Sequence, residues 1–452
     1  MANLTTTFAG IQSLNPFWLA SAPPTNTGKQ IMRTFEAGWG GAVWKTIGVP
    51  ARNVSSRLSA LDHGPNKMIG LNNIELISDR SVEENLKEME EVKRKFPNHT
   101  VIASLMVETR DEWKKIIHQV QDVGADGIEL NFGCPHGMCE RGMGSAVGQE
   151  PKLIEMITAW AKEFSRVPVI VKLTPNVTDI NVSAGAARRG GADAVSLINT
   201  VKSIISVDIE QFVPLPVVGI SGSGGSSSGS SGRSSGGSSG GSSGSGGNSS
   251  GSSGGNFARG SEGAKGTNGG YCGPAVKPIA LHMVASIARK YGPTLPISGI
   301  GGISTWKDAV EFMTLGAGNV QVCTAVMHYG YRIVEDLIQG LSNYLDRKGF
   351  DSVQSVVGKA VPQFTDWSSL DQEFHHVATI HESHCIGCNL CVVTCDDGGH
   401  QCIDLNPQRH TAGATHAPIV RHEECVGCNL CMLVCPSPGA ITMTPATRHH
   451  HS

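Results

Sequence analysis

A thiol follows a strand-like run of residues in the first third of the chain. Residues 128–137 read Ile-Glu-Leu-Asn-Phe-Gly-Cys-Pro-His-Gly, so apolar residues run into Asn131 before Gly133, Cys134 and Pro135 break the pattern. This order predicts a strand that ends in a loop carrying Cys134. The thiol could give or take a proton there, close to an amide that could bind a planar polar ligand. The competing interpretation is a half-buried structural cysteine at a strand end.

Eight further cysteines stand in two short runs near the C-terminus. Residues 385–395 have the spacing C-x2-C-x2-C-x3-C, and residues 425–435 repeat it. This spacing is typical of bacterial ferredoxin modules with two [4Fe–4S] clusters, in which the fourth cysteine of each run ligates the other cluster. We therefore assign one cluster to Cys385, Cys388, Cys391 and Cys435, and the other to Cys425, Cys428, Cys431 and Cys395. Zinc is the alternative, but zinc ribbons pair two well-separated C-x2-C arms.

Composition limits the classes of protein that fit. The chain has 452 residues, a formal net charge of -3 and 13 cysteines, and Cys402 is left over beside the two runs as an expected structural cysteine. An odd, clustered cysteine count argues against a disulfide framework and for metal thiolates in a reducing compartment. Neither a basic surface for nucleic acid nor an apolar run long enough for a membrane is present, and the first residues lack the pattern of a signal peptide. We expect a cytoplasmic protein.

Strand-like and helix-like segments alternate from residue 1 to about residue 350, which predicts an α/β fold. The expected strands are 17–21, 41–46, 101–106, 126–131, 168–173, 193–198, 295–299 and 319–323. The expected helices include 81–94, 111–123, 151–164, 276–290 and 305–315. Eight such units favour a (β/α)8 TIM barrel, with a doubly wound open sheet as the alternative. In a barrel, functional residues gather at the C-terminal ends of the strands.

Polar residues do stand at the expected strand ends. They are Ser21, Lys45, Thr46, Asn131, Lys172, Asn199 and Thr200. Any one of them could be an ordinary rim residue, but two lysines and two asparagines at separate strand ends argue for a site. After the seventh strand, Gly299, Gly301 and Gly302 could let the backbone approach a phosphate, with Cys323 and Thr324 beside them. An ordinary tight turn is the alternative there.

The remaining segments suggest the domain organisation. We expect the barrel domain to span residues 1–350, interrupted at about 221–256 by a serine- and glycine-rich tract that predicts a flexible coil of natural or engineered origin. A connecting segment, 351–379, precedes a ferredoxin-like domain at 380–445, and residues 446–452 are expected to be a disordered tail. The chain carries no G-x-G-x-x-G dinucleotide fingerprint after an N-terminal strand.

Taken together, these motifs resemble the pyrimidine-reducing half of the dihydropyrimidine dehydrogenases, and specifically their bacterial iron–sulfur subunit. The resemblance covers nearly the whole chain outside the serine- and glycine-rich tract. Its most specific parts are the tandem cysteine runs and residues 71–78, 129–138, 172–179 and 199–201. Dihydroorotate dehydrogenases are similar in the barrel but lack the tail.

The resemblance implies an FMN cofactor and a pyrimidine substrate. FMN would be held by Ser21, Lys45, Thr46, Lys172, Gly273, Gly301, Gly302, Cys323 and Thr324. The pyrimidine would be bound by Asn73, Glu75, Ile77, Asn131, Asn199 and Thr200. Cys134 would be the general acid that protonates C5 of the pyrimidine while hydride passes from flavin N5 to C6. Amide side chains suit the planar carbonyl and N–H groups of uracil, and a lysine would stabilise negative charge on the reduced ring.

Two departures from that family, and the partner, complete the expectations. Gly133 stands where mammalian members have serine, and the serine- and glycine-rich tract interrupts a loop near the active site. Because the chain has no nucleotide motif, we expect a separate flavoprotein subunit with FAD to take hydride from NAD(P)H and pass electrons through the clusters, in a heterotetramer. The alternatives are a dihydroorotate dehydrogenase-type enzyme and a ferredoxin-like electron carrier on an inactive barrel.

Overall fold

The structure is a computed structural model that describes residues 2–49, 53, 57–135, 137, 142–210, 212–219, 264–371, 373–408 and 416–446. It divides into two compact units, Met1–Phe364 and Thr365–Ser452. The expected connecting segment, 351–379, is therefore divided between the two units. The serine- and glycine-rich tract at 221–256 lies outside the described residues, and so do residues 447–452 of the expected tail.

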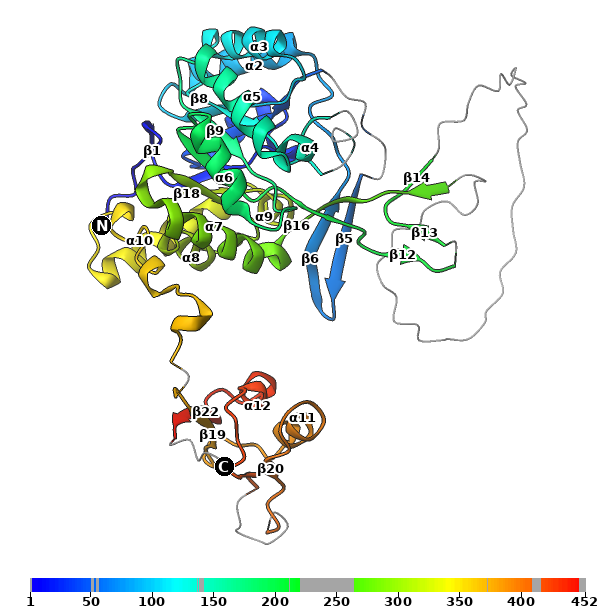
Figure 1. The fold of residues 1–452 in the computed structure, drawn as a ribbon, viewed down its shortest axis with the longest axis vertical. Helices are drawn as coiled ribbons and strands as arrows, with labels where there is room; N and C mark the ends of the chain where they lie inside the picture. Colours follow the sequence, from blue (N-terminus) through cyan, green and yellow to red (C-terminus); the bar gives the residue numbers. More distant parts are fainter. Residues whose placement is uncertain are drawn as a thin grey trace, which may run out of the picture. The chain divides into compact units, whose positions relative to one another are not determined.

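The first unit contains a closed barrel of eight parallel strands (Figure 1). In chain order they are β3 (Phe17–Leu19), β4 (Gly41–Ile47), β7 (Thr100–Leu105), β8 (Gly127–Asn131), β9 (Val169–Lys172), β10 (Ala194–Leu197), β17 (Ile297–Ile300) and β18 (Ala317–Val322). The ring closes where Val320 of β18 pairs with Phe17 of β3. All eight expected strands are confirmed, and the closed ring excludes the open sheet.

Helices follow the strands and cover the outside of the barrel. They are α1 (Gly28–Glu36), α2 (Val82–Lys95), α3 (Arg110–Asp122), α5 (Pro151–Phe164), α6 (Ile180–Arg189), α7 (Lys277–Tyr291), α8 (Trp306–Thr314) and α10 (Ile333–Lys348). Local sequence explains where several of them begin. Ser81, Thr109 and Thr305 each accept a hydrogen bond from the third residue of the following helix and form capping boxes.

A four-stranded antiparallel sheet forms at the C-terminal ends of the barrel strands. Its order is β11 (Val201–Ser203), β16 (Gly269–Cys272), β6 (Asn66–Asn73) and β5 (Leu58–His63). Asn73 of β6 lies opposite Gly270 of β16. The sheet thus joins the segment after the second barrel strand to the segment after the sixth, and it carries residues 71–78 to the mouth of the barrel.

The second unit consists of two similar halves. β19 (His376–Ile380) pairs with β22 (Ile441–Pro445), and β20 (Ile403–Asp404) pairs with β21 (Ile419–Val420). Each cysteine run leads into a helix, α11 (Leu390–Gly398) or α12 (Leu430–Val434).

Equivalent backbone hydrogen bonds relate the two halves of this unit. The N–H of His381 donates to the carbonyl of Ala440 at 2.8 Å, and the N–H of Arg421 donates to the carbonyl of Cys402 at 2.8 Å. His381 and Arg421 each stand four residues before the first cysteine of a run. Cys402 and Ala440 therefore occupy equivalent places.

Among the described residues, no helix combines the length and apolar character needed to cross a bilayer.

Candidate active site and iron–sulfur ligands

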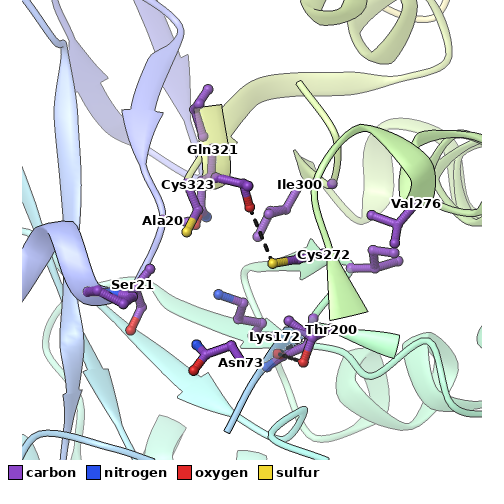
Figure 2. A pocket seen from close by; sticks show the side chains of 18 of the residues that line it. Ala20, Ser21, Asn73, Lys172, Thr200, Cys272, Val276, Ile300, Gln321 and Cys323 are labelled. Atoms are coloured by element: carbon purple, nitrogen blue, oxygen red, sulfur yellow. Dashed lines mark hydrogen bonds between the residues drawn. The ribbon is translucent and has the colours of Figure 1, made fainter. Parts of the chain in front are cut away.

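One cavity at the mouth of the barrel brings together all the predicted residues of the first unit except Gly299. Figure 2 shows several of them around it. The predicted residues that line it are Cys134, Ser21, Lys45, Thr46, Lys172, Gly273, Gly301, Gly302, Cys323, Thr324, Asn73, Glu75, Ile77, Asn131, Asn199 and Thr200. Lys45, Thr46, Asn131 and Lys172 come from three barrel strands, β4, β8 and β9, and the others come from the small sheet and from the segments that follow the strands. The tertiary fold alone therefore explains their convergence.

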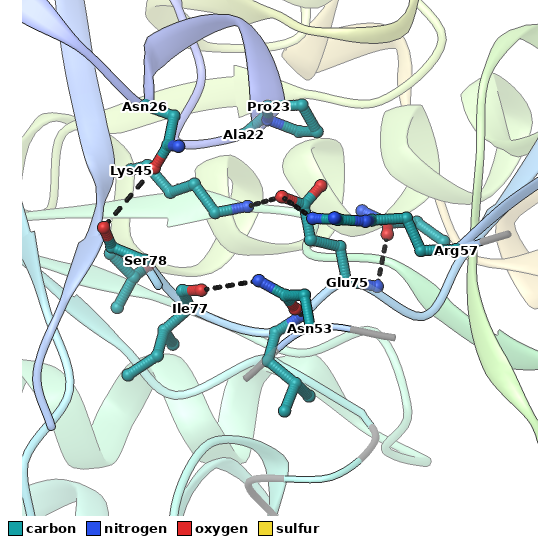
Figure 3. Close-up of polar contacts among 12 residues, drawn as sticks. Ala22, Pro23, Asn26, Lys45, Asn53, Arg57, Glu75, Ile77 and Ser78 are labelled. Atoms are coloured by element: carbon teal, nitrogen blue, oxygen red, sulfur yellow. Dashed lines mark hydrogen bonds and ion pairs between the residues drawn. The ribbon is translucent and has the colours of Figure 1, made fainter. Parts of the chain in front are cut away.

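Both predicted lysines are buried and paired with carboxylates. Lys45 Nζ lies 2.8 Å from Glu75 Oε1, and Lys172 Nζ lies 3.6 Å from Glu129 Oε1. Only 5% of each lysine side chain is exposed. Burial of an ammonium group is costly unless an anion lies near it, so each carboxylate offsets the cost of its lysine. Arg57 also approaches Glu75 Oε1, at 3.3 Å (Figure 3).

Hydrogen bonds fix the orientation of the amides at the end of β8 and β10. Asn199 Nδ2 donates to Asn131 Oδ1 at 3.0 Å, and Asn131 Nδ2 donates to Thr46 Oγ1 at 2.9 Å. Thr46 Oγ1 also lies within hydrogen-bond distance of Ser104 and Ser21, at 3.0 and 3.2 Å. The two asparagines thus present a defined pattern of donors to the cavity.

Cys134 is held between the cavity and a small apolar cluster. It is 9% exposed and packs with Ile77, Met106 and Met143. The carbonyl of Cys134 accepts a hydrogen bond from Ser145 N at 3.0 Å. The thiol therefore lies in the loop after β8, where this hydrogen bond holds the Cys134 backbone. Residues 138–141 of the same loop lie outside the described part of the chain.

Gly133 has a steric reason to be glycine in this chain. A Cβ atom built there would lie 2.4 Å from both Cβ and Nδ2 of Asn199. Asn199 thus occupies the space that a side chain at position 133 would need. The Gly133 N–H donates to Asn131 Oδ1 at 3.2 Å, so the glycine supports the amide pair through its backbone.

The glycines after β17 expose their backbone to the cavity, which suits a phosphate group. Gly301 and Gly302 have φ angles of +128° and +77°, which favour glycine. A Cβ atom at Gly302 would lie 2.8 Å from Lys277 Cβ and 3.0 Å from the carbonyl of Gly273. The expectation for Gly299 is wrong: it does not line the cavity, and a Cβ there would lie 2.5 Å from Phe312. Gly299 makes room for helix packing instead.

Sequence reasoning missed one thiol, Cys272, and one tyrosine, Tyr271, in the same cavity. Tyr271 and Cys272 of β16 line it, and Thr324 Oγ1 donates to Cys272 Sγ at 3.3 Å. Burial raises the pKa of Cys272 to about 11 and that of Cys323 to about 12. Both groups therefore remain thiols at neutral pH. The sequence offered no local signal for Cys272 because it enters the site through the small sheet.

A buried polar layer beneath the cavity was also missed. Glu129 is fully buried in β8 and accepts a hydrogen bond from Ser196 Oγ at 2.8 Å. Gln321 of β18 lines the cavity and donates to Ser298 Oγ at 3.0 Å. The signal was visible for Glu129, since a carboxylate between Ile128 and Leu130 has no place in a purely apolar strand.

In the second unit, the thiols of each tetrad line one small hollow. Cys395, Cys425, Cys428 and Cys431 line the first hollow, together with Cys402. Cys385, Cys388, Cys391 and Cys435 line the second. These are the two crossed sets that the spacing predicts. Four soft thiol donors around a hollow fit an iron–sulfur cluster.

The chain combines a (β/α)8 barrel that has a polar, lysine-bearing cavity at its strand ends with a second unit that carries two cysteine tetrads. These features define a barrel oxidoreductase with an iron–sulfur domain. Residues 3–230 and 248–345 match the dihydroorotate dehydrogenase family, and residues 378–443 match the 4Fe-4S dicluster domain. The chain belongs to the dihydroorotate dehydrogenase family and carries a 4Fe-4S dicluster domain at its C-terminal end.

Named relatives fall in two groups. The chain is 40% identical over 413 residues to the NAD-dependent dihydropyrimidine dehydrogenase subunit PreA of Escherichia coli K12, covering 90% of this chain and 89% of that protein. It is 35% identical to the chloroplastic dihydropyrimidine dehydrogenase (NADP(+)) of Arabidopsis thaliana, over 81% of this chain and 79% of the relative. It is 33% identical to the catalytic subunit of dihydroorotate dehydrogenase B (NAD(+)) of Pyrococcus abyssi, over 78% of this chain and 97% of the relative.

The protein is accordingly an oxidoreductase of this family, with FMN and two [4Fe–4S] clusters as its cofactors. The dicluster match sets aside zinc as the metal of the cysteine runs. The cavity of the barrel and the two thiol-lined hollows offer donor sets that suit these groups.

Proposed function

We propose that this chain reduces the 5,6 double bond of uracil and thymine to the 5,6-dihydropyrimidine, as the catalytic subunit of an NAD(P)H-dependent enzyme. Bound FMN would supply the hydride, from its N5 to C6 of the pyrimidine. Cys134 would donate the proton to C5. The observation that carries this proposal is the convergence of Cys134, two buried lysines and paired asparagines on one cavity.

The paired asparagines suit a neutral pyrimidine ring. Among the bonds of the described residues, Asn131 and Asn199 each use one of their two amide N–H groups. The second N–H of each would donate to a ring carbonyl, as uracil and thymine offer. The bonds to Thr46 and between the two amides would hold these donors in place before substrate arrives, which reduces the entropy lost on binding.

Glu75 offers a hydrogen-bond acceptor to a pyrimidine ring. Its carboxylate lines the cavity, and 8% of the side chain is exposed. A carboxylate can accept from a ring N–H. Because Lys45 and Arg57 offset its charge, Glu75 alone does not separate uracil and thymine from the second candidate substrate, dihydroorotate, which the dihydroorotate dehydrogenase B relative suggests.

The source of electrons would be a separate flavoprotein subunit that binds FAD and oxidises NAD(P)H. The sequence contains no dinucleotide fingerprint, and the Escherichia coli relative is named as a subunit of an NAD-dependent enzyme. The two cysteine tetrads would relay electrons from that partner, in a heterotetramer, towards the barrel.

Replacement of the thiol tests the proposed acid. The full chain, reconstituted with FMN, iron and sulfide and supplied with a chemical reductant, should reduce uracil and thymine. Cys134→Ala should keep its FMN and lose turnover by about 100-fold or more, as loss of a general acid does. Cys134→Ser, which keeps the shape but is a weaker acid, should also be slow. A Cys134→Ala protein that reduces uracil at the normal rate would contradict the assignment.

Substrate comparison tests the reaction itself. The same preparation should be assayed with uracil, thymine and orotate, and in reverse with dihydrouracil and dihydroorotate. Turnover of orotate or dihydroorotate without turnover of the uncarboxylated bases would overturn the proposal in favour of the second candidate.

A further inference from the structure

A fifth thiol lies beside one of the two cysteine tetrads. Cys402 lines the same hollow as Cys395, Cys425, Cys428 and Cys431. It is 3% exposed. Its Sγ lies 3.7 Å from Cys395 Sγ, and its backbone N–H donates to the same sulfur at 3.4 Å. The thiol therefore faces the predicted ligand and not the solvent.

These two sulfur atoms are about as far apart as two thiolates that bind the same metal ion. Thiolates that share a tetrahedral ion, with metal–sulfur bonds of about 2.3 Å, stand about 3.8 Å apart. Cys395 and Cys402 could thus reach the same iron through side-chain rotation, without a change in the backbone.

Comparison of the two halves of the unit shows that packing does not require this thiol. Ala440 takes the place equivalent to Cys402, since its carbonyl accepts the bond from His381 just as that of Cys402 accepts the bond from Arg421. Ala440 lines the other hollow and is fully buried. A methyl group is sufficient there. No fifth cysteine lines that second hollow within the described part of the chain.

We propose that Cys402 is a reserve ligand for the iron held by Cys395. When Cys395 is lost or detached, Cys402 binds the iron in its place, and the proton of the Cys402 thiol passes to the departing Cys395 thiolate or, in its absence, to solvent. One iron–sulfur bond breaks and one forms, so no electron is gained or lost. The inference is independent of the pyrimidine substrate and concerns only the second unit.

Single removal of equivalent ligands in the full-length protein tests the idea. Wild-type protein should hold about eight irons per chain, and Cys395→Ala should retain about eight, with both reduced clusters visible by electron paramagnetic resonance. Cys435→Ala, which removes the equivalent ligand of the other tetrad, should fall to about four. The double variant Cys395→Ala/Cys402→Ala should also fall to about four. FMN content reports that the barrel unit of each variant is folded.

Two results would overturn the proposal. If Cys395→Ala loses as much iron as Cys435→Ala, Cys402 does not act as a ligand. If the double variant keeps all of its iron, some other group replaces Cys395.

A second experiment adds a thiol to the other half of the unit. Ala440→Cys places a thiol at the equivalent position of the other half, so Ala440→Cys/Cys435→Ala should recover the irons that Cys435→Ala loses. A purely structural role for Cys402 predicts no such recovery. A transplant that recovers no iron would overturn the geometric basis of the proposal.

Discussion

Lys45 and Glu75 form an ion pair at 2.8 Å inside the mouth of the barrel. Lys45 belongs to β4 and is predicted to hold FMN, whereas Glu75 follows β6 and is predicted to bind the pyrimidine. The two predicted parts of the site therefore share one buried pair. Asn53 accepts a hydrogen bond from Leu76 N at 2.6 Å and so holds the segment that carries Glu75. Its side-chain amide also donates to the carbonyl of Ile77 (Figure 3).

The first prediction concerns this pair. Glu75→Gln leaves the ammonium of Lys45 buried without its anion, which costs about 3 kcal/mol or more when one partner of a buried pair is removed. The free energy of unfolding of the flavin-free chain, measured in urea, should fall by about that amount. Glu163→Gln, which removes an exposed pair with Arg110, should change it little. A loss in Glu75→Gln no larger than that in Glu163→Gln would contradict the prediction.

The second prediction concerns Gly302, one of the two glycines after β17 that line the cavity. Gly302→Ala would force its Cβ against Lys277 and the carbonyl of Gly273, so the loop must move. FMN affinity, measured by flavin fluorescence on flavin-free chain, should fall at least about tenfold, or about 1.4 kcal/mol. Gly349→Ala is the matched control, because Gly349 has a similar φ of +70° but open space around it. That variant should lose about 1 kcal/mol of stability and keep its FMN affinity. Unchanged affinity in Gly302→Ala would place the phosphate elsewhere.

The third prediction concerns Glu129. This buried carboxylate is the anion closest to Lys172, at 3.6 Å. In Glu129→Gln the lysine charge is no longer offset, so negative charge on reduced FMN should be stabilised more strongly. The two-electron potential of the flavin should rise by about 30 mV, equivalent to about 1.4 kcal/mol. A redox titration of the flavin checks this, and an unchanged or lower potential would mean that Lys172 does not act on the ring.

The fourth prediction concerns acid stability. Glu88 of α2 receives two hydrogen bonds of 2.7 Å from Arg80 and one of 2.6 Å from Gly28 N at the start of α1. The hydrogen bonds from Arg80 are the main cause that lowers the pKa of Glu88 below its ordinary value of 4.5. A lowered folded-state pKa gives stability that is fully present above pH 4.5 and lost as the pH falls through the folded-state pKa.

Wild-type protein and Glu88→Gln should therefore differ in unfolding free energy by about 1 kcal/mol or less at neutral pH, because the pair is partly exposed. The difference should shrink as the pH falls below 4.5. Urea unfolding across this range checks the prediction, and a gap that widens in acid would contradict it.

The barrel could be predicted from sequence because its strands are buried on both sides. Such strands appear as apolar runs, and their polar ends point to one mouth. The small sheet could not be predicted in the same way. Tyr271 pairs with Asn72, about 200 residues away, and neither segment shows which distant strand it will meet. Cys272 reaches the cavity only through that pairing.

Glycines and lone cysteines limited the prediction of the site. Gly299, Gly301 and Gly302 look alike in sequence, yet Gly299 makes room for Phe312 whereas the other two line the cavity. Cys402 was expected to be structural, and only the coordinates place its sulfur beside Cys395. Nor does the sequence explain why position 133 is glycine, whereas the structure shows that Asn199 fills the space a side chain would need.

The predicted crossing of the tetrads has a consequence for how the protein matures. Cys435 lines the hollow of the first run and Cys395 lines that of the second, so with this ligation each hollow needs a donor from both runs. During synthesis the hollow of the first run would then lack one donor until Cys435 has been made. We therefore expect iron and sulfide to be taken up only after both runs are present, and the bound clusters to link the two segments.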